Sequence, residues 1–251
     1  MNSYKEHYKQ CLKNSKVPQS EQGGFDLYEL DLIPQFLTCE EEYKKLILTI
    51  SQKLNDQFSS LNEDIIEEYN CLRLASYKGI PEILDLVRYV ERQVEQKVFH
   101  TKVKTEHIHT YRNIFKEDSK TSWVWHYDNC PNEIIKLAIY LNDVTAQSAP
   151  MEVLTNEYGY LKYSTSALAH DSDRKTTKMF NNGRSSRIPE EVIADLQERK
   201  EYQVTQLVGQ RGFNFLFNAN IAHRATIPNL GQYRDAIFLY LRPAISKPRR
   251  L

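Results

Sequence analysis

The sequence is short of the features that mark several large classes of protein. Glycine accounts for only 8 of the 251 residues against 16 tyrosines, and no low-complexity tract is present, so we expect a folded chain rather than a disordered or fibrous one. The four cysteines stand far apart, at Cys11, Cys39, Cys71 and Cys130, and no two form a Cys-x-x-Cys pair. We therefore expect reduced thiols rather than a zinc or redox motif.

Net charge is missing as well. The 33 basic residues are balanced by 33 acidic ones, so no overall field attracts nucleic acid or a membrane surface. No apolar run reaches the length of a transmembrane helix, and residues 1–10 lack the apolar centre of a signal peptide. We expect a cytoplasmic protein that has neither a nucleic-acid nor a membrane partner. The sequence leaves its oligomeric state open.

The spacing of apolar residues changes near residue 100. The polar residues 1–24 are expected to form a loose arm, and residues 25–100 a helical layer. Two apolar stripes with the period of an α-helix define that layer. They contain Tyr43, Leu46, Ile47, Ile50, Leu54 and Phe58 in the first helix, and Ile83, Leu84, Val87, Val90, Val94 and Val98 in the second.

From about residue 101 the period approaches two, as in β-strands. The expected strands cover residues 102–110, 123–127, 134–141, 151–154, 203–208, 213–217 and 233–241. Such strands after a helical layer predict a mainly β fold with flanking α: a double-stranded β-helix, or cupin-like jelly roll, with the N-terminal helices packed on one sheet. We expect one domain over residues 1–251, with its jelly-roll core at 101–243 and an insertion at 155–202.

A histidine and a carboxylate lie two residues apart in an aromatic segment. In an extended chain His126 and Asp128 point to one side, and Trp125 and Tyr127 to the other. A second histidine, His223, ends a later apolar strand. Two histidines and one carboxylate are the protein ligands of the facial triad that holds non-haem Fe(II) and leaves positions open. A His-x-Asp pair alone is more typical of a solvated strand end, but its order and context here favour a metal site.

Arg234 shares one face of the last expected strand with Ala236, Phe238 and Tyr240. A buried arginine on such a face is costly unless it pairs with an anion. The sequence leaves two partners open, namely the carboxylate of a cosubstrate, which suits the guanidinium fork, and an internal Asp or Glu. Arg224 faces away from its neighbour His223 in an extended chain, so we expect it to be structural.

Residues 137–154 read LAIYLNDVTAQSAPMEVL, between the WHYD motif at 125–128 and the distal His223. In this combination the sequence resembles the phytanoyl-CoA dioxygenase family of Fe(II)/2-oxoglutarate-dependent oxygenases, over about residues 100–243. It departs from the family pattern at three places. Ser148-Ala149 stands where the family has Asn-Gly, and Asn156-Glu157-Tyr158 replaces the Gly-Ser-His that often closes the hinge. Ala225 stands where many members have a hydroxyl residue that contacts the cosubstrate.

The resemblance implies a set of roles. Fe(II) would be held by His126, Asp128 and His223, with 2-oxoglutarate and O2 as cosubstrates. Arg234 would hold the distal carboxylate of 2-oxoglutarate, and Asn113 would lie near the same cosubstrate. The implied reaction hydroxylates a C–H bond of a small-molecule metabolite and releases succinate and CO2. Related halogenases lack the carboxylate ligand, so the presence of Asp128 favours hydroxylation.

Two other classes stay open. One is a metal-binding barrel of the cupin type with an isomerase-like activity. The absence of a third clustered histidine and the presence of Arg234 argue against it. The other is a catalytically inactive binding protein on the same fold, which the retention of all three ligand types argues against.

The insertion carries an excess of positive charge. Between Asp171 and Arg187 the charged residues are Arg174, Lys175, Lys178, Arg184 and Arg187 against Asp171 and Asp173, and a helix is expected at 189–196. A lid of this composition would favour a substrate that carries carboxylate or phosphate. The alternative is a surface loop whose charges meet only water.

Overall fold

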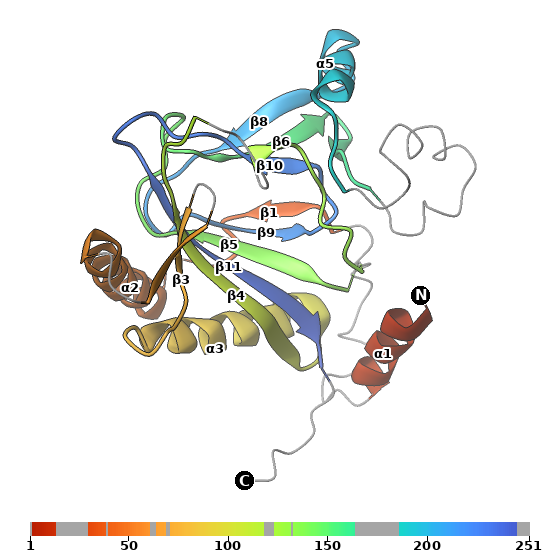
Figure 1. The fold of residues 1–251 in the computed structure, drawn as a ribbon. Helices are drawn as coiled ribbons and strands as arrows, with labels where there is room; N and C mark the ends of the chain where they lie inside the picture. Colours follow the sequence, from red (N-terminus) through yellow and green to blue (C-terminus); the bar gives the residue numbers. More distant parts are fainter. Residues whose placement is uncertain are drawn as a thin grey trace.

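The computed structural model describes residues 2–13, 30–38, 40–60, 64–68, 71–117, 123–131, 133–163 and 186–244. Their strands form two antiparallel sheets, and the helices α2 and α3 lie on the outer side of the larger one (Figure 1). The larger sheet has the order β1 (Leu32–Pro34), β9 (Asn214–Asn218), β5 (Ile135–Tyr140), β11 (Arg234–Pro243), β4 (Val103–Asn113), β3 (Cys71–Leu74) and β2 (Ile65–Glu68). The smaller sheet has the order β10 (His223–Ala225), β6 (Met151–Asn156) and β7 (Gly159–Tyr160), with β8 (Gln203–Leu207) also paired to β6.

Strand β5 shows how the larger sheet separates two cores. Ile135, Leu137 and Ile139 point to the helical side, where they join the largest apolar cluster. Ala138 and Tyr140 point the other way, into the space between the sheets. This strand is buried on both faces, because helices cover one of them and the second sheet covers the other.

The outer face of the larger sheet is covered by α2 (Glu41–Ser60) and α3 (Glu82–Val94), the latter continued by the π-helical turn η1 (Glu95–Phe99). The first predicted stripe is confirmed, since its residues face this core. In the second, Leu84 is 44% exposed and Leu86 is buried in its place. The buried face of α3 therefore includes Leu86 instead of Leu84, so it is rotated about the helix axis relative to the predicted face.

This architecture confirms the predicted fold class: mainly β with flanking α, a jelly roll of two sheets with N-terminal helices packed on one of them. The helical layer at 25–100 needs correction, because it also contributes β1, β2 and β3 to the larger sheet. These strands are three or four residues long, too short for a period of two to stand out.

The expected loose arm also needs correction over its first half, which forms α1 (Asn2–Lys13). Cys11 in this helix is 1% exposed, its carbonyl accepts a hydrogen bond from the Thr101 hydroxyl, and the Tyr8 hydroxyl donates to the Phe99 carbonyl. These contacts join α1 to the end of the helical layer. Residues 14–24 lie outside the described residues.

Two further segments bear on the site. The strand expected at 123–127 is reduced to isolated bridges at His126. His126 pairs with Arg187 on one side and with His223 on the other, so the segment does not follow a single neighbouring strand. The helix expected at 189–196 is present as α5 (Glu190–Glu198). The basic residues 174, 175, 178 and 184 of the insertion lie outside the described residues. No helix in the part of the chain that the structure describes is long and apolar enough to cross a membrane.

Candidate metal centre

Main-chain pairing brings the two motif histidines together from distant parts of the chain. The amide of His126 donates to the carbonyl of His223 over 3.0 Å, and the amide of His223 donates to the carbonyl of His126 over 2.8 Å. This reciprocal antiparallel bridge fixes both Cα positions, and the two imidazole centroids lie 4.3 Å apart. The position of the second histidine is therefore set by backbone hydrogen bonds and does not depend on a metal.

The acidic residue of the motif is held by the same β9–β10 connection. The amide of Asp128 donates to the carbonyl of Ala219 over 2.9 Å. Two residues further on, the Asn220 side chain accepts from the Cys130 amide (3.0 Å) and donates to the Cys130 carbonyl (2.7 Å). Asn129 lies between these contacts in the left-handed region, at φ 53°, a conformation that asparagine tolerates better than most residues. The turn that follows Asp128 is thus clamped on both sides.

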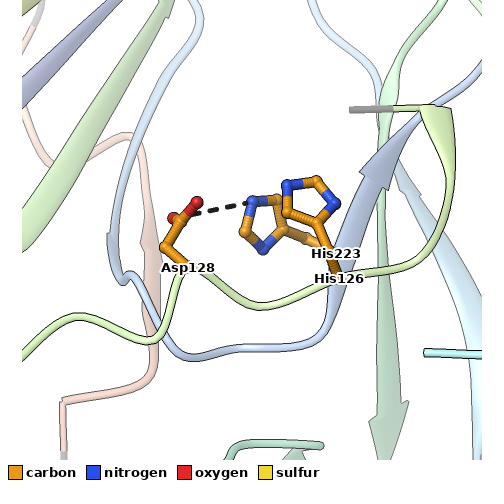
Figure 2. Close-up of side chains that lie close together, drawn as sticks. All are labelled: His126, Asp128 and His223. Atoms are coloured by element: carbon orange, nitrogen blue, oxygen red, sulfur yellow. Dashed lines mark ion pairs between the residues drawn. The ribbon is translucent and has the colours of Figure 1, made fainter. Parts of the chain in front are cut away.

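The three predicted ligands converge on one point (Figure 2). One candidate ligand atom from each of His126, Asp128 and His223 lies within 4.8 Å of the other two. Asp128 Oδ2 is 3.9 Å from His223 Nε2. Ligand atoms at bonds of about 2.1 Å and right angles lie about 3 Å apart, so only small side-chain movements would close this set around a divalent cation. The structure therefore brings together the whole predicted triad.

The second nitrogen of each imidazole is already engaged. His126 Nδ1 lies 2.9 Å from the Val124 carbonyl, and His223 Nδ1 lies 2.7 Å from the Ile221 carbonyl, in each case two residues back along the chain. A carbonyl only accepts, so Nδ1 carries the proton and the lone pair is on Nε2. Both rings are thus oriented with Nε2 available to a metal, and the carbonyl partners are the supporting contacts that such ligands require.

The protonation state also suits a cation. Burial lowers the pKa of His126 to about 3 and that of His223 to about 4, so both rings are neutral at pH 7. Burial works to raise the pKa of Asp128, but Lys136 and the two histidines outweigh it and bring the pKa to about 2. Neutral imidazoles and an ionised carboxylate are the forms that bind metals.

The opposite side of the motif is a packing surface, as its alternation predicts. Trp125 is fully buried, and Tyr127 stacks on Tyr163 at 4.6 Å between ring centroids. Arg224 lies over the Trp125 ring and forms ion pairs with the carboxylate of Glu152 and with that of Glu190 further out. The expectation that Arg224 is structural agrees with these contacts.

Arg234 lies on the inner face of β11 and is 1% exposed. Its Nη2 donates a hydrogen bond over 2.9 Å to Oδ1 of Asn113, on the neighbouring strand β4. Nε and Nη1 are buried and have no hydrogen-bond partner among the described residues. Among the described residues no carboxylate pairs with Arg234, and the adjacent Asp235 binds Arg112 on the other face. A buried guanidinium with two orphaned donors is suited to an anionic ligand.

Sequence reasoning missed Lys136. Its side chain is 5% exposed and its Nζ lies 2.5 Å from Oδ2 of Asp128. Burial works to lower the pKa of Lys136, but Asp128 and the Tyr240 hydroxyl outweigh it and raise that pKa above its usual value. The signal was visible in the sequence, because a single lysine interrupts the apolar run of β5 at a position that faces the space between the sheets.

These side chains surround one cavity of about 350 Å³. Its lining includes the three candidate ligands, Arg234 with Asn113, and Lys136. Ser186, Arg187, His109, Tyr111 and Tyr240 also line it. Of the basic residues in the insertion between positions 171 and 187, Arg187 is the one that the structure describes. It is exposed and lines this cavity. A volume of this size accommodates a small organic molecule.

Two of the departures from the family pattern, at Ala149 and at Ala225, have different structural consequences. Ala149 adopts φ 64°, the conformation for which glycine is usual, and it is fully buried. The hinge therefore keeps its backbone shape without its glycine. Ala225 lines the cavity and offers no hydroxyl, whereas Ser186 from the insertion lines the same cavity.

Comparison with solved structures finds the same fold in non-haem enzymes. The α-ketoglutarate-dependent epimerase SnoN of nogalamycin biosynthesis matches with a TM-score of 0.56 at 11% identity, over 91% of this chain and 84% of that one. EctD from S. alaskensis, crystallised with 2-oxoglutarate and 5-hydroxyectoine, matches with 0.55 at 15% identity, over 93% and 80%. The α-ketoglutarate-dependent carbocyclase SnoK matches with 0.54 at 14% identity, over 91% and 85%. This chain has their fold.

Comparisons at the level of sequence add nothing to this. A scan against protein-family models finds no match, and a search of the curated proteins finds none either. At identities of 11–15% the structural likeness defines the fold alone. The chemistry therefore depends on the residues of the cavity.

Proposed function

We propose that this protein is a non-haem Fe(II)/2-oxoglutarate-dependent dioxygenase of the phytanoyl-CoA dioxygenase type, which hydroxylates a C–H bond of a small-molecule metabolite. The observation that carries the proposal is the presence, in one cavity, of the His126–Asp128–His223 set and a buried arginine with two orphaned donors. A metal triad alone would suit many metalloproteins, and a buried arginine alone would suit any anion. Together they match the two ends of a chelating keto acid.

The three ligands would occupy one face of the metal and leave the other positions open to exogenous ligands. His126 and His223 would bind through Nε2, because their Nδ1 atoms are committed to main-chain carbonyls. Asp128 would bind as the carboxylate. The donor set of two imidazoles and one carboxylate is the one that non-haem Fe(II) oxygenases use.

Arg234 would hold the distal carboxylate of 2-oxoglutarate through Nε and Nη1, the two donors that the described residues do not satisfy. Asn113 would orient the guanidinium by accepting from Nη2 and contribute to the same subsite. The Tyr140 ring lies 5.8 Å from the guanidinium carbon, and Tyr111 lines the same end of the cavity. In such surroundings an arginine–carboxylate pair is strong because little water screens it.

When bound, the iron would supply the activation of O2 that couples decarboxylation of 2-oxoglutarate to succinate with oxidation of the substrate. The protein's part is to fix three ligands, to anchor the cosubstrate and to admit the substrate to the remaining side. The retained carboxylate ligand Asp128 supports hydroxylation. The similar folds include an epimerase and a carbocyclase, so a second candidate outcome is oxidation of the substrate without oxygen insertion.

The proposal is tested by succinate release from 2-oxoglutarate in the presence of Fe(II), O2 and candidate metabolites. His126→Ala and His223→Ala should abolish release while the far-ultraviolet circular dichroism stays unchanged. His100→Asn is the matched control, because His100 lies outside the cavity at φ 51°, a conformation that asparagine tolerates. Full activity of His126→Ala would refute the assignment. Incorporation of ¹⁸O from ¹⁸O2 into the product would separate hydroxylation from epimerisation or ring closure.

A further inference from the structure

Lys136 is a buried cation to which the proposed reaction assigns no role. It lies in the middle of β5, in register with Tyr240 of β11 on one side and Phe217 of β9 on the other. Its ammonium group lies 4.5 Å from the centroid of the Tyr240 ring, 5.6 Å from Phe217 and 5.9 Å from Phe238. Three aromatic rings and the candidate metal ligands therefore surround a lysine that lines the cavity.

A buried ammonium group needs an anion to offset its desolvation. In the metal-free protein that anion is Asp128, at 2.5 Å. A divalent cation bound to His126, Asp128 and His223 would take up most of the charge of the same carboxylate. Lys136 would then keep its position inside the barrel but lose much of its electrostatic compensation. The occupied site thus calls for a further anion beside Lys136.

The cosubstrate does not fill this need if it is anchored as proposed. Arg234 is the first residue of β11, whereas Tyr240, the cross-strand neighbour of Lys136, lies six residues further along the same strand. A distal carboxylate held by Arg234 is therefore on the Arg234 side of the metal site and not beside Lys136. A molecule that reaches from the metal towards Arg234 extends away from the Tyr240 end of β11, so Lys136 faces the side that remains for the substrate.

The charges around the cavity point the same way. Among its described lining residues four are cationic, Lys136, Arg187, Arg224 and Arg234, and only Asp128 is acidic. Arg224 is balanced by two carboxylates outside the cavity, and Arg234 would be balanced by the cosubstrate. The positive charge of Lys136 is left for the substrate.

We infer that Lys136 is the recognition site for a carboxylate of the primary substrate, which is a small carboxylic acid whose apolar body packs against Tyr240 and Phe238. This inference rests on the proposed function, because the bound acid is a substrate only if the protein is the proposed oxygenase. A lysine ammonium has three N–H donors. Asp128 accepts one of these hydrogen bonds in the ligand-free protein, so donors remain for the bound acid.

The test uses benzoate, a flat aromatic carboxylate, and benzamide, which has the same shape without the charge. Both are titrated anaerobically into the protein saturated with Fe(II) and 2-oxoglutarate, and binding is followed by ligand-observed NMR and by the change in the visible spectrum. Lys136→Met keeps the length of the side chain and removes its charge. Lys53→Met is the matched control, because Lys53 pairs with Glu82 between α2 and α3, away from the cavity.

Benzoate should bind to the wild type and to the Lys53→Met variant at least about tenfold more tightly than to Lys136→Met, and benzamide should bind to none of them. The affinity for 2-oxoglutarate should change by no more than about twofold in Lys136→Met. Equal benzoate binding in wild type and Lys136→Met would overturn the inference. So would failure of benzoate to bind to the wild type, or a loss of 2-oxoglutarate affinity in Lys136→Met as large as that in an Arg234 variant.

A metal-free arm separates this inference from the proposed function. Asp128→Asn removes the carboxylate partner of Lys136 without changing the shape of the side chain. Without any metal, this variant should bind benzoate more tightly than the wild type, and Asp128→Asn/Lys136→Met should lose that gain. If no Fe(II)–2-oxoglutarate complex forms but this pattern holds, the proposed function fails while the carboxylate site stands. If the double variant binds benzoate as well as Asp128→Asn, the carboxylate site fails.

Discussion

Replacement of Arg234 by methionine should have opposite effects on stability and on cosubstrate binding. The side chain is 1% exposed, and two of its nitrogens lack hydrogen-bond partners among the described residues. Each unsatisfied buried donor costs about 1–3 kcal/mol, and the hydrogen bond to Asn113 that the variant also loses contributes about 1.5–3 kcal/mol. The ligand-free Arg234→Met protein should therefore be as stable as the wild type or more stable, by about 1–2 kcal/mol.

Cosubstrate binding should respond in the other direction. Removal of one partner of a buried charge pair costs about 2–5 kcal/mol, which corresponds to a rise in the dissociation constant of about 30-fold to several thousand-fold. The assay is urea unfolding under anaerobic conditions with Fe(II), with and without 2-oxoglutarate. At 100 times its dissociation constant the keto acid should stabilise the wild type by about 2.7 kcal/mol. At the same concentration it should stabilise Arg234→Met by no more than about 0.9 kcal/mol.

The matched control is Arg242→Met. Arg242 lies on the same strand but pairs with Glu106 near the surface. The Arg242→Met variant should be stabilised by 2-oxoglutarate as much as the wild type. A loss of about 3 kcal/mol or more in ligand-free Arg234→Met would refute the reasoning, because Arg234 would then be a structural residue. Full stabilisation of the variant by 2-oxoglutarate would refute it equally.

The remaining predictions concern protons and packing. The pKa values of His126 and His223 are about 3 and about 4 in the folded chain, so only the unfolded chain takes up protons at these residues just below pH 6.5. The metal-free protein should therefore lose stability as the pH falls from about 6.5 to about 4. At pH 5.5 the two rings together should cost about 3 kcal/mol relative to pH 7.5 in urea titrations, and a variant with glutamine at both positions that keeps the full pH dependence would contradict this. Ala149→Val should lose about 2 kcal/mol or more in thermal unfolding because a β-branched side chain is strained at φ 64°, whereas Ala149→Gly should stay within about 1 kcal/mol; equal losses would contradict the strain argument. Arg112 and Asp235 form a buried pair with two bonds of 2.7 Å, so Arg112→Met alone should lose about 3–5 kcal/mol and Arg112→Met/Asp235→Leu much less; a double variant no more stable than the single one would argue against it.

Local geometry explains which parts of the site could be predicted from the sequence. The common direction of His126 and Asp128 follows from the alternation of an extended chain, and that alternation holds even though the segment forms only isolated bridges. The burial of Arg234 follows from its place on an apolar strand face. These inferences need no knowledge of distant contacts. The pairing of His126 with His223, by contrast, was expected only from the order of the motifs.

The contacts that sequence reasoning missed all depend on tertiary structure. Lys136 is unusual in an apolar strand, but only the folded structure shows that β5 brings it to its partner Asp128. The Asn220 amide that clamps Cys130 connects positions 90 residues apart, and asparagine carries no sign of that role in the sequence. The edge strands β1, β2 and β3 are defined by the strands they join rather than by their own short patterns.

The most direct test of the central claim is the visible spectrum of the protein mixed anaerobically with Fe(II) and 2-oxoglutarate. A keto acid that chelates protein-bound Fe(II) gives a weak charge-transfer band, which neither component gives with the protein alone. The wild type should show this band, His223→Ala should not, and Arg234→Met should require a much higher 2-oxoglutarate concentration to develop it. Absence of the band from folded wild-type protein at saturating concentrations of both components would contradict the assignment.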